Sequence, residues 1–149
     1  LYGGLSGQLA NKNLDSSEKF QLGGPSGIRA YPVGEASGDE GISLSTELRY
    51  DVQRPILKSR LQAVLFFDVG RIKLHDSPWT NSVNTATGKN DYNLAGAGLG
   101  LNLDYSTLCS VRASYAHTIG SNPGRSTSGN NADNRDNDHR VWLQAILRF

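Results

Sequence analysis

The sequence contains no run of about 18 consecutive apolar residues, so it offers no candidate for a transmembrane helix. It also lacks segments with apolar residues at helical spacing. Methionine is absent, even at position 1, and no signal peptide precedes the first strand-like segment. We therefore expect the chain to be part of a longer, processed precursor. The single cysteine, Cys109, excludes an internal disulfide framework.

Charge is nearly balanced, with 15 Lys and Arg against 14 Asp and Glu. The basic residues are scattered, and this excludes the positive patch of a nucleic-acid-binding protein. His75, His117 and His139 lie in separate segments without the spacing of metal ligands, so no metal or other cofactor is expected. No Ser–His–Asp or paired-carboxylate arrangement supports catalysis, and we expect no enzyme activity.

Glycine, in contrast, is frequent, at 17 of 149 residues. The pair Gly23-Gly24 and the series Gly96, Gly98 and Gly100 are not phosphate-binding loops, because no helix is predicted after either. The series alternates with apolar residues along one strand. We interpret it as small residues that leave room for a buried loop or a passing chain.

Period-two alternation of apolar and polar residues runs through the chain and predicts an all-β protein with antiparallel strands. Seven strands are predicted, near 1–10, 17–24, 41–51, 61–70, 94–105, 108–119 and 140–149. Most have about ten residues, the length that a tilted strand needs to cross a bilayer. Three long polar loops, at 25–39, 71–91 and 120–138, alternate with shorter connections. Outer-membrane barrels have this asymmetry, with the long loops outside the cell.

The two faces of the predicted strands differ in a way that suits a membrane barrel. Leu65, Leu99, Leu101, Val111 and Leu143 are expected to face lipid, and Asn102, Arg112 and Gln144 to face the lumen. Arginines at 49, 112, 140 and 148 all fall on the non-apolar faces, as a wet lumen allows. A soluble antiparallel sandwich also alternates and remains an alternative. Seven strands cannot complete a bacterial barrel, which has an even number, so the missing strands are expected upstream.

Two segments are more specific than alternation. The first is the loop around Ile28-Arg29-Ala30-Tyr31, and the second is Phe66-Phe67-Asp68-Val69-Gly70 at the end of a strand. With the closing Leu147-Arg148-Phe149, they resemble the TpsB transporters of two-partner secretion, relatives of the barrel-assembly insertase. The resemblance runs from about residue 17 to residue 149. Ala30 departs from the glycine of the family's signature loop, and a methyl group there makes a positive φ costly.

The resemblance implies a sixteen-stranded outer-membrane barrel, preceded by POTRA domains and a plug helix, of which this chain forms the last seven strands. It implies that loop 25–39 folds into the lumen, where Arg29 meets Asp68 on the wall. The residues alone place Asp68 on the non-apolar face of its strand, where a carboxylate needs a cation. Read without the resemblance, the residues favour Arg29 as a solvated loop residue and Asp68 as a turn residue near a strand end. Phe149 is expected to point outward and to act as an assembly signal.

We therefore predict a pore in the bacterial outer membrane that exports a secreted partner, a haemolysin- or adhesin-like exoprotein, without enzymatic activity or cofactor. The expected partners are that exoprotein, the lipid bilayer and the barrel-assembly machinery, with no nucleic acid. The alternatives are an insertase-type assembly barrel, a passive porin and a soluble carbohydrate-binding β-domain.

Overall fold

The computed structural model describes residues 1–52, 59–105 and 108–148, and all of its regular elements are strands. They are β1 (Tyr2–Gln8), β2 (Phe20–Gln21), β3 (Ser37–Gly38), β4 (Glu40–Asp51), β5 (Arg60–Lys73), β6 (Asp91–Tyr105), β7 (Cys109–Thr118) and β8 (His139–Leu147). No helix in these described ranges is long and apolar enough to cross a membrane. The all-β, antiparallel class predicted from the alternation is confirmed.

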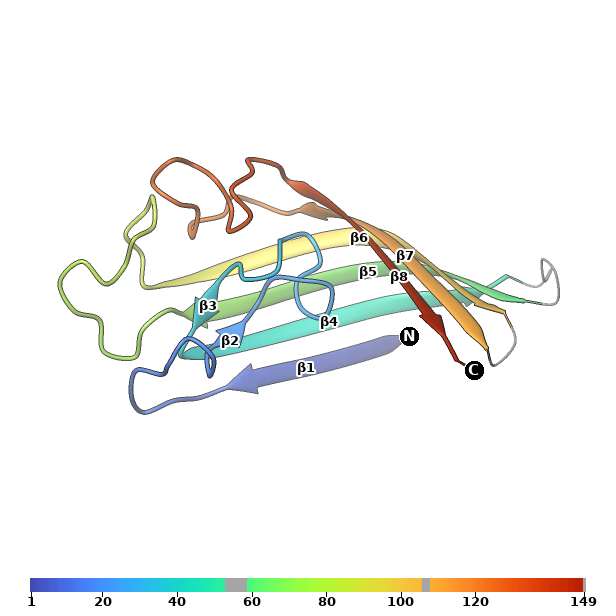
Figure 1. Cartoon of the computed structure of the whole chain (residues 1–149), viewed down its shortest axis with the longest axis horizontal. Helices are drawn as coiled ribbons and strands as arrows, with labels where there is room; N and C mark the ends of the chain where they lie inside the picture. The colour runs from blue at the N-terminus through green and yellow to red at the C-terminus, as the bar shows by residue number, and fades with distance from the viewer. Residues whose placement is uncertain (53–58, 106–107, 149) are drawn as a thin grey trace.

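Six strands form one antiparallel sheet in the order β1-β4-β5-β6-β7-β8, and β2 pairs with β3 in a small second sheet (Figure 1). In the large sheet β4 to β8 follow one another in sequence order, because each pair is joined by a direct reversal of the chain. The connection from β1 to β4 is different. It contains residues 9–39 and carries the small sheet with it.

The predicted strand near 17–24 is wrong as a strand of the large sheet. Only Phe20–Gln21 is extended there, and it pairs with Ser37–Gly38 rather than with the wall. The reason lies just downstream, where Gly24 adopts a φ of 116° and turns the chain away. The wall in the described residues thus has six strands instead of seven.

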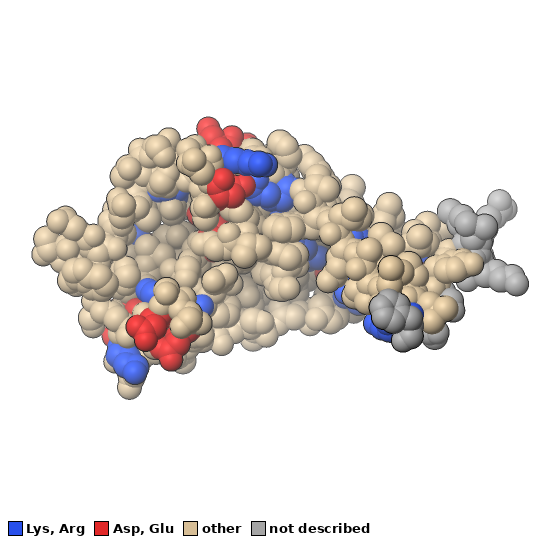
Figure 2. Space-filling view, viewed as in Figure 1, with Lys and Arg blue, Asp and Glu red and all other residues tan. Residues whose placement is uncertain are grey.

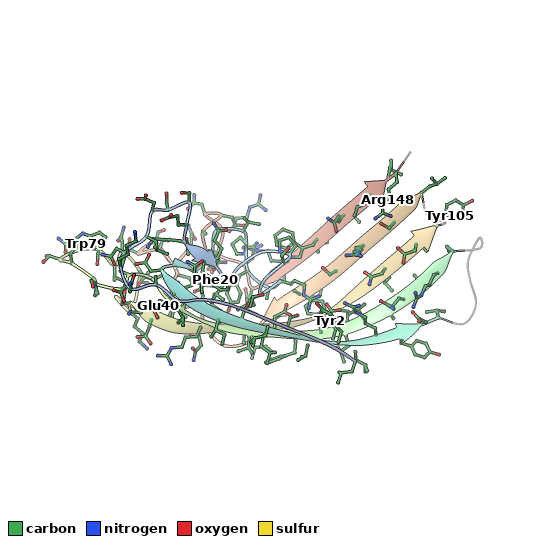
Figure 3. The ribbon with its side chains drawn as sticks, turned by 90° about the horizontal axis from the view of Figure 1, so that it is seen from below. Tyr2, Phe20, Glu40, Trp79, Tyr105 and Arg148 are labelled. Atoms are coloured by element: carbon green, nitrogen blue, oxygen red, sulfur yellow. The ribbon has the colours of Figure 1, made fainter. Side chains whose placement is uncertain are left out.

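The sheet is curved around residues 20–38, which we call the covering loop (Figure 3). Arg29 in this loop contacts both β4 and β8. Those strands are four places apart in the sheet order, which in a flat sheet would separate them by about 19 Å. One residue can reach both only because the sheet bends. We call the face under the covering loop the inner face and the opposite face the outer face.

The hydrophobic core lies between the covering loop and the inner face. Leu22 and Ile28 from the loop are fully buried, as is Ile72 from the wall. A Cβ atom added at Gly96 would lie 2.4 Å from the Cβ of Ala30. Gly96 therefore leaves the space that Ala30 of the loop fills, as the sequence predicted for the glycine series, whereas Cβ atoms added at Gly98 and Gly100 would meet atoms of the wall itself. Burial of each large apolar side chain contributes about 1.5–3 kcal/mol.

The outer face is apolar and uncovered over most of its height. Leu65, Leu99, Leu101 and Leu143 are between 53% and 75% exposed on it. On β6 the apolar residues run from Ala95 to Tyr105, about 33 Å along the strand. At the usual barrel tilt this corresponds to about 25 Å, the height of the apolar band of outer-membrane barrels. Figure 2 shows charged side chains clustered at the lower left and at the top of the view, with a largely uncharged surface along the middle of the lower edge.

In the described residues the large sheet is open, with β1 and β8 at its edges. The chain therefore forms a curved section of wall together with the loop that covers its inner face. The ends of the section are clear in Figure 3, where Trp79 marks the loop end and Tyr105 and Arg148 mark the opposite end.

Candidate functional site

The covering loop has its own compact backbone structure, which fixes the position of its tip. The amide of Ile28 donates to the carbonyl of Leu22 at 2.7 Å, and that of Gly24 donates to Tyr31 at 3.1 Å. At Gly27 a Cβ atom would lie 2.1 Å from the Leu22 carbonyl oxygen, so only glycine fits this close approach. The β2–β3 pair closes the base of the loop. Arg29 is thereby presented to the wall by a rigid turn.

The Arg29 side chain forms a dense set of charge-assisted hydrogen bonds with two wall strands. Its Nε and Nη2 atoms donate to the two carboxylate oxygens of Asp68 at 2.9 and 2.8 Å. Its Nη1 atom donates to Glu47 at 2.6 Å, and Nη2 also donates to Ser45 at 3.0 Å. Asp68 is only 1% exposed and accepts further bonds from the Arg29 amide and the Ser45 hydroxyl. The paired fork and carboxylate are the strongest geometry available to such groups.

Two aromatic residues complete the surroundings of Arg29. Its guanidinium lies 3.5 Å from the centre of the Phe66 ring, which is a cation–π contact. On the opposite side, the indole N–H of Trp142 on β8 donates to the Arg29 carbonyl oxygen at 2.8 Å. Arg29 therefore ties the covering loop to β4, β5 and β8 together.

The charges around Arg29 balance. Glu47 is shared between Arg29 and Arg49, whose Nε atom donates to it at 2.7 Å. With Asp68, the cluster contains two cations and two carboxylates. Such an arrangement can hold a loop in place and can release it if one contact is lost. It contains no arrangement for covalent or acid–base chemistry.

The remaining residues of the two motifs lie in the loop–wall interface. Ile28 and Tyr31 are buried, and Ala30 lies over Gly96. The φ of Ala30 is not positive, so the position does not require glycine. Burial, helped by the charge of Glu35, raises the pKa of Tyr31 to about 12.

On the wall, Phe66 faces Arg29, and Gly70 lies under the loop, where an added Cβ would be 2.7 Å from Leu22. Phe149, the predicted assembly signal, lies outside the described residues. Its role stays a prediction.

A second contact links the covering loop to the predicted external loop 120–138. The carboxylate of Glu35, only 3% exposed, accepts from the Asn122 side chain at 2.8 Å and from the Ala132 amide at 2.7 Å. Asn122 in turn donates to Asn131 at 3.0 Å. The external loop is thus fastened to the top of the covering loop.

A third contact holds the base. Asp39 is fully buried and forms an ion pair with Lys19 at 2.8 Å. It also accepts from the amides of Leu14 and Asp76. Burial alone would raise the pKa of Asp39, but Lys19 and the two amides outweigh it and keep that pKa below its usual value.

Sequence reasoning missed Ser45, Glu47 and Trp142. Each has the correct alternation for the inner face, but only the strand register reveals its neighbours, as in the pairing of Ser45 with Asp68. Of the three histidines, His117 and His139 lie opposite each other on the separate strands β7 and β8. Among the described residues, no three His, Cys, Asp or Glu side chains gather into a metal site.

Comparison with known proteins identifies the family. A family model described as haemolysin secretion/activation protein ShlB/FhaC/HecB matches residues 1–103, which include both motifs. The chain belongs to this family. The resemblance read from the two motifs is confirmed.

Two curated relatives are similar over nearly the whole chain. Both are named heme/hemopexin transporter protein HuxB, from Haemophilus influenzae strains 86-028NP and ATCC 51907 / DSM 11121 / KW20 / Rd. They are 35% and 36% identical over 148 residues, which is 98% of this chain. The chain spans 23% of the length of each relative. No solved structure matches the chain.

Proposed function

We propose that the parent protein of this chain is an outer-membrane pore that exports a secreted partner protein by two-partner secretion. Its 149 residues supply six neighbouring strands of the wall of a larger barrel, with sixteen strands in the complete pore. The covering loop lies in the lumen. The bilayer contacts the outer face, and the barrel-assembly machinery inserts the protein, with Phe149 as part of its signal.

One observation carries this proposal: the wall has an apolar outer face, while on its inner face Arg29 holds a loop through Asp68 and Glu47. Lipid suits the first face and a water-filled lumen suits the second. A loop held by charges can be released without unfolding the wall, which is what a gate for a passing protein requires. Family membership supports the same function.

The names of the two relatives extend the proposal to the cargo. We propose that the exported partner is a haemolysin- or adhesin-like exoprotein whose task involves heme or hemopexin. The export step itself would use no nucleotide or other cofactor. Folding of the partner outside the cell would supply the free energy.

Deletion of the parent gene, with complementation, tests this function. Mass spectrometry of the medium and of the purified outer membrane should show that one large secreted protein is lost while other outer-membrane proteins keep their amounts. Binding of the lost protein to hemopexin and to heme then tests the cargo class. Loss of many barrels at once would instead indicate an insertase. An unchanged set of secreted proteins with altered uptake of small solutes would indicate a porin.

A further inference from the structure

Beyond the tip of the covering loop, the inner face keeps an open hollow of about 680 Å³. One level of the sheet crosses this hollow from β4 to β8 as a row of polar side chains. The row consists of directly paired residues: Asp51, Gln62, Asn102, Arg112 and Gln144. We call it the polar row.

Three residues of the polar row, Asp51, Gln62 and Asn102, are hydrogen-bonded to one another. The amide of Gln62 donates to Asp51 at 2.8 Å, and the amide of Asn102 donates to Gln62 at 3.2 Å. The bonds run in one direction, towards the carboxylate, and they stop at Asn102. Its side-chain oxygen accepts no hydrogen bond from the part of the chain that the structure describes, and the residue lines the hollow.

The other two residues of the polar row are open. Arg112 and Gln144 form no side-chain hydrogen bond or ion pair within residues 1–52, 59–105 and 108–148. Other arginines of the inner face differ, since Arg49, Arg60 and Arg140 each have a carboxylate partner. Neither β7 nor β8 contains Asp or Glu, so these two strands offer Arg112 no partner of their own.

The unbonded amide and guanidinium groups of the polar row are suited to bind an extended polypeptide. Every residue of an extended polypeptide presents a backbone donor, an acceptor or both. Amide side chains such as those of Asn102 and Gln144 can bond either kind of group, whatever the sequence. Each such bond is weak in net terms, so a chain could move past it. Arg112 adds five donors that favour carbonyl and carboxylate oxygens.

We propose that Arg112 and Gln144, together with the neighbouring Asn102, form a contact site for the exported polypeptide in an extended state. Arg112 binds its backbone carbonyls and, more strongly, its Asp and Glu side chains. The amides on either side bind its backbone. This inference rests on the proposed export function and adds to it where the cargo touches the wall and which segments it favours.

Site-specific photo-crosslinking in the full-length parent tests the contact. A photoreactive residue is placed at Asn102 or Arg112, and its matched control at Leu101 or Val111, the neighbours that alternate to the outer face. Export is stalled by fusing a tightly folded domain to the end of the partner. Crosslinks to the partner from 102 and 112, but not from 101 and 111, are expected. Crosslinks to an upstream segment of the parent instead, or equal crosslinking from both faces, would overturn the site.

A charge test addresses the preference for acidic segments. Arg112→Glu should slow export of the natural partner by roughly tenfold or more, as expected for loss of one charge-assisted hydrogen bond, whereas Arg112→Lys should slow it less. A partner whose Asp and Glu are replaced by Asn and Gln over a test segment should lose this dependence while that segment passes. Barrel yield in the outer membrane is measured for each variant to exclude misfolding.

The result separates two failures. If deletion of the parent leaves secretion intact, the export function itself is wrong. If deletion abolishes secretion but Arg112→Glu exports acidic and neutral partners at unchanged rates, the pore remains and the proposed contact site is wrong.

Discussion

The contact between Arg29 and Asp68 allows the most specific prediction, because removing Arg29 and removing Asp68 should destabilise the closed loop by different amounts. Arg29→Ala removes the guanidinium that both Asp68 and Glu47 contact, and Asp68 is left buried without a cation. Breaking a buried pair from one side costs about 3–5 kcal/mol. We expect the loop-closed state to lose about that amount.

Asp68→Ala should cost less. Arg29 then keeps its bond to Glu47 at 2.6 Å and its contact with Phe66 at 3.5 Å, so its charge stays compensated. The loss should be about 1.5–3 kcal/mol for the fork as a whole, the range for a hydrogen bond to a charged group. The double variant should lose clearly less than the sum of the two, with a coupling of about 1–3 kcal/mol.

Arg29→Lys should restore only part of the closed state. Arg29 binds Asp68, Glu47 and Ser45 through three different nitrogen atoms, and a single ammonium cannot reproduce that spread. The conservative change therefore separates the geometry of the contact from its charge.

The assay uses the full-length parent in bilayers, with a cysteine placed at Ile28, which is fully buried while the covering loop is closed, and with Cys109 replaced by serine. The rate of thiol labelling from the lumen gives the population of the released loop, and secretion is measured in parallel. The order of effects should be Arg29→Ala, then Asp68→Ala, then the wild type. Strictly additive losses, or an Asp68→Ala variant that opens the loop more than Arg29→Ala does, would refute the reasoning.

Three further predictions follow from the wall and the loop base. Gly96→Ala should displace the loop because its Cβ would lie 2.4 Å from that of Ala30. In the double variant with Ala30→Gly, the thiol-labelling rate and secretion should return to their wild-type values. Leu101→Arg should destabilise folding into bilayers by about 2–4 kcal/mol at the mid-plane, measured by urea titration, whereas Asn102→Arg should cost much less. Asp39 has a lowered pKa, so its stabilising effect is present above its unfolded pKa of about 4 and is lost as the pH falls through its folded pKa. Protease sensitivity of residues 11–19 should therefore rise in strong acid, and Asp39→Asn should remove this pH dependence.

The faces of the strands could be predicted from the sequence because alternation is a local property. A residue and its neighbour point to opposite sides of any strand, so Leu101 and Asn102 had to differ. The structure puts Leu101 on the uncovered outer face and Asn102 in the hollow. No knowledge of the partner strands was needed for that step.

The prediction of a wall strand near 17–24 was wrong because it used the same alternation that correctly predicted the other strands. Phe20 and Leu22 alternate as they would in a wall strand, yet both are packed in the interface between loop and wall. A loop that lies on a sheet has an apolar side and a polar side, just as a strand does. The turn at Gly24 was the signal against a long strand.

The partners of Arg29 could be predicted only in part. The motif resemblance pointed to Asp68, but Glu47 is brought to it by the register between β4 and β5, and Trp142 by the curvature of the whole sheet. Register and curvature are properties of several strands together. A shift of the register by two residues would keep every face assignment and replace every neighbour.

Ala30, where the family's loop has glycine, shows that the sequence of the loop and the packing of the wall must be considered together. Taken alone, alanine in place of the family's glycine makes a positive φ costly at this position. In the structure its backbone has no positive φ, and its methyl group occupies the space that Gly96 leaves on β6. The loop and the wall together have room for one Cβ at this contact, and this chain carries it on the loop. What determines the fit is therefore the sum of the two residues, which a reading of either motif by itself cannot supply.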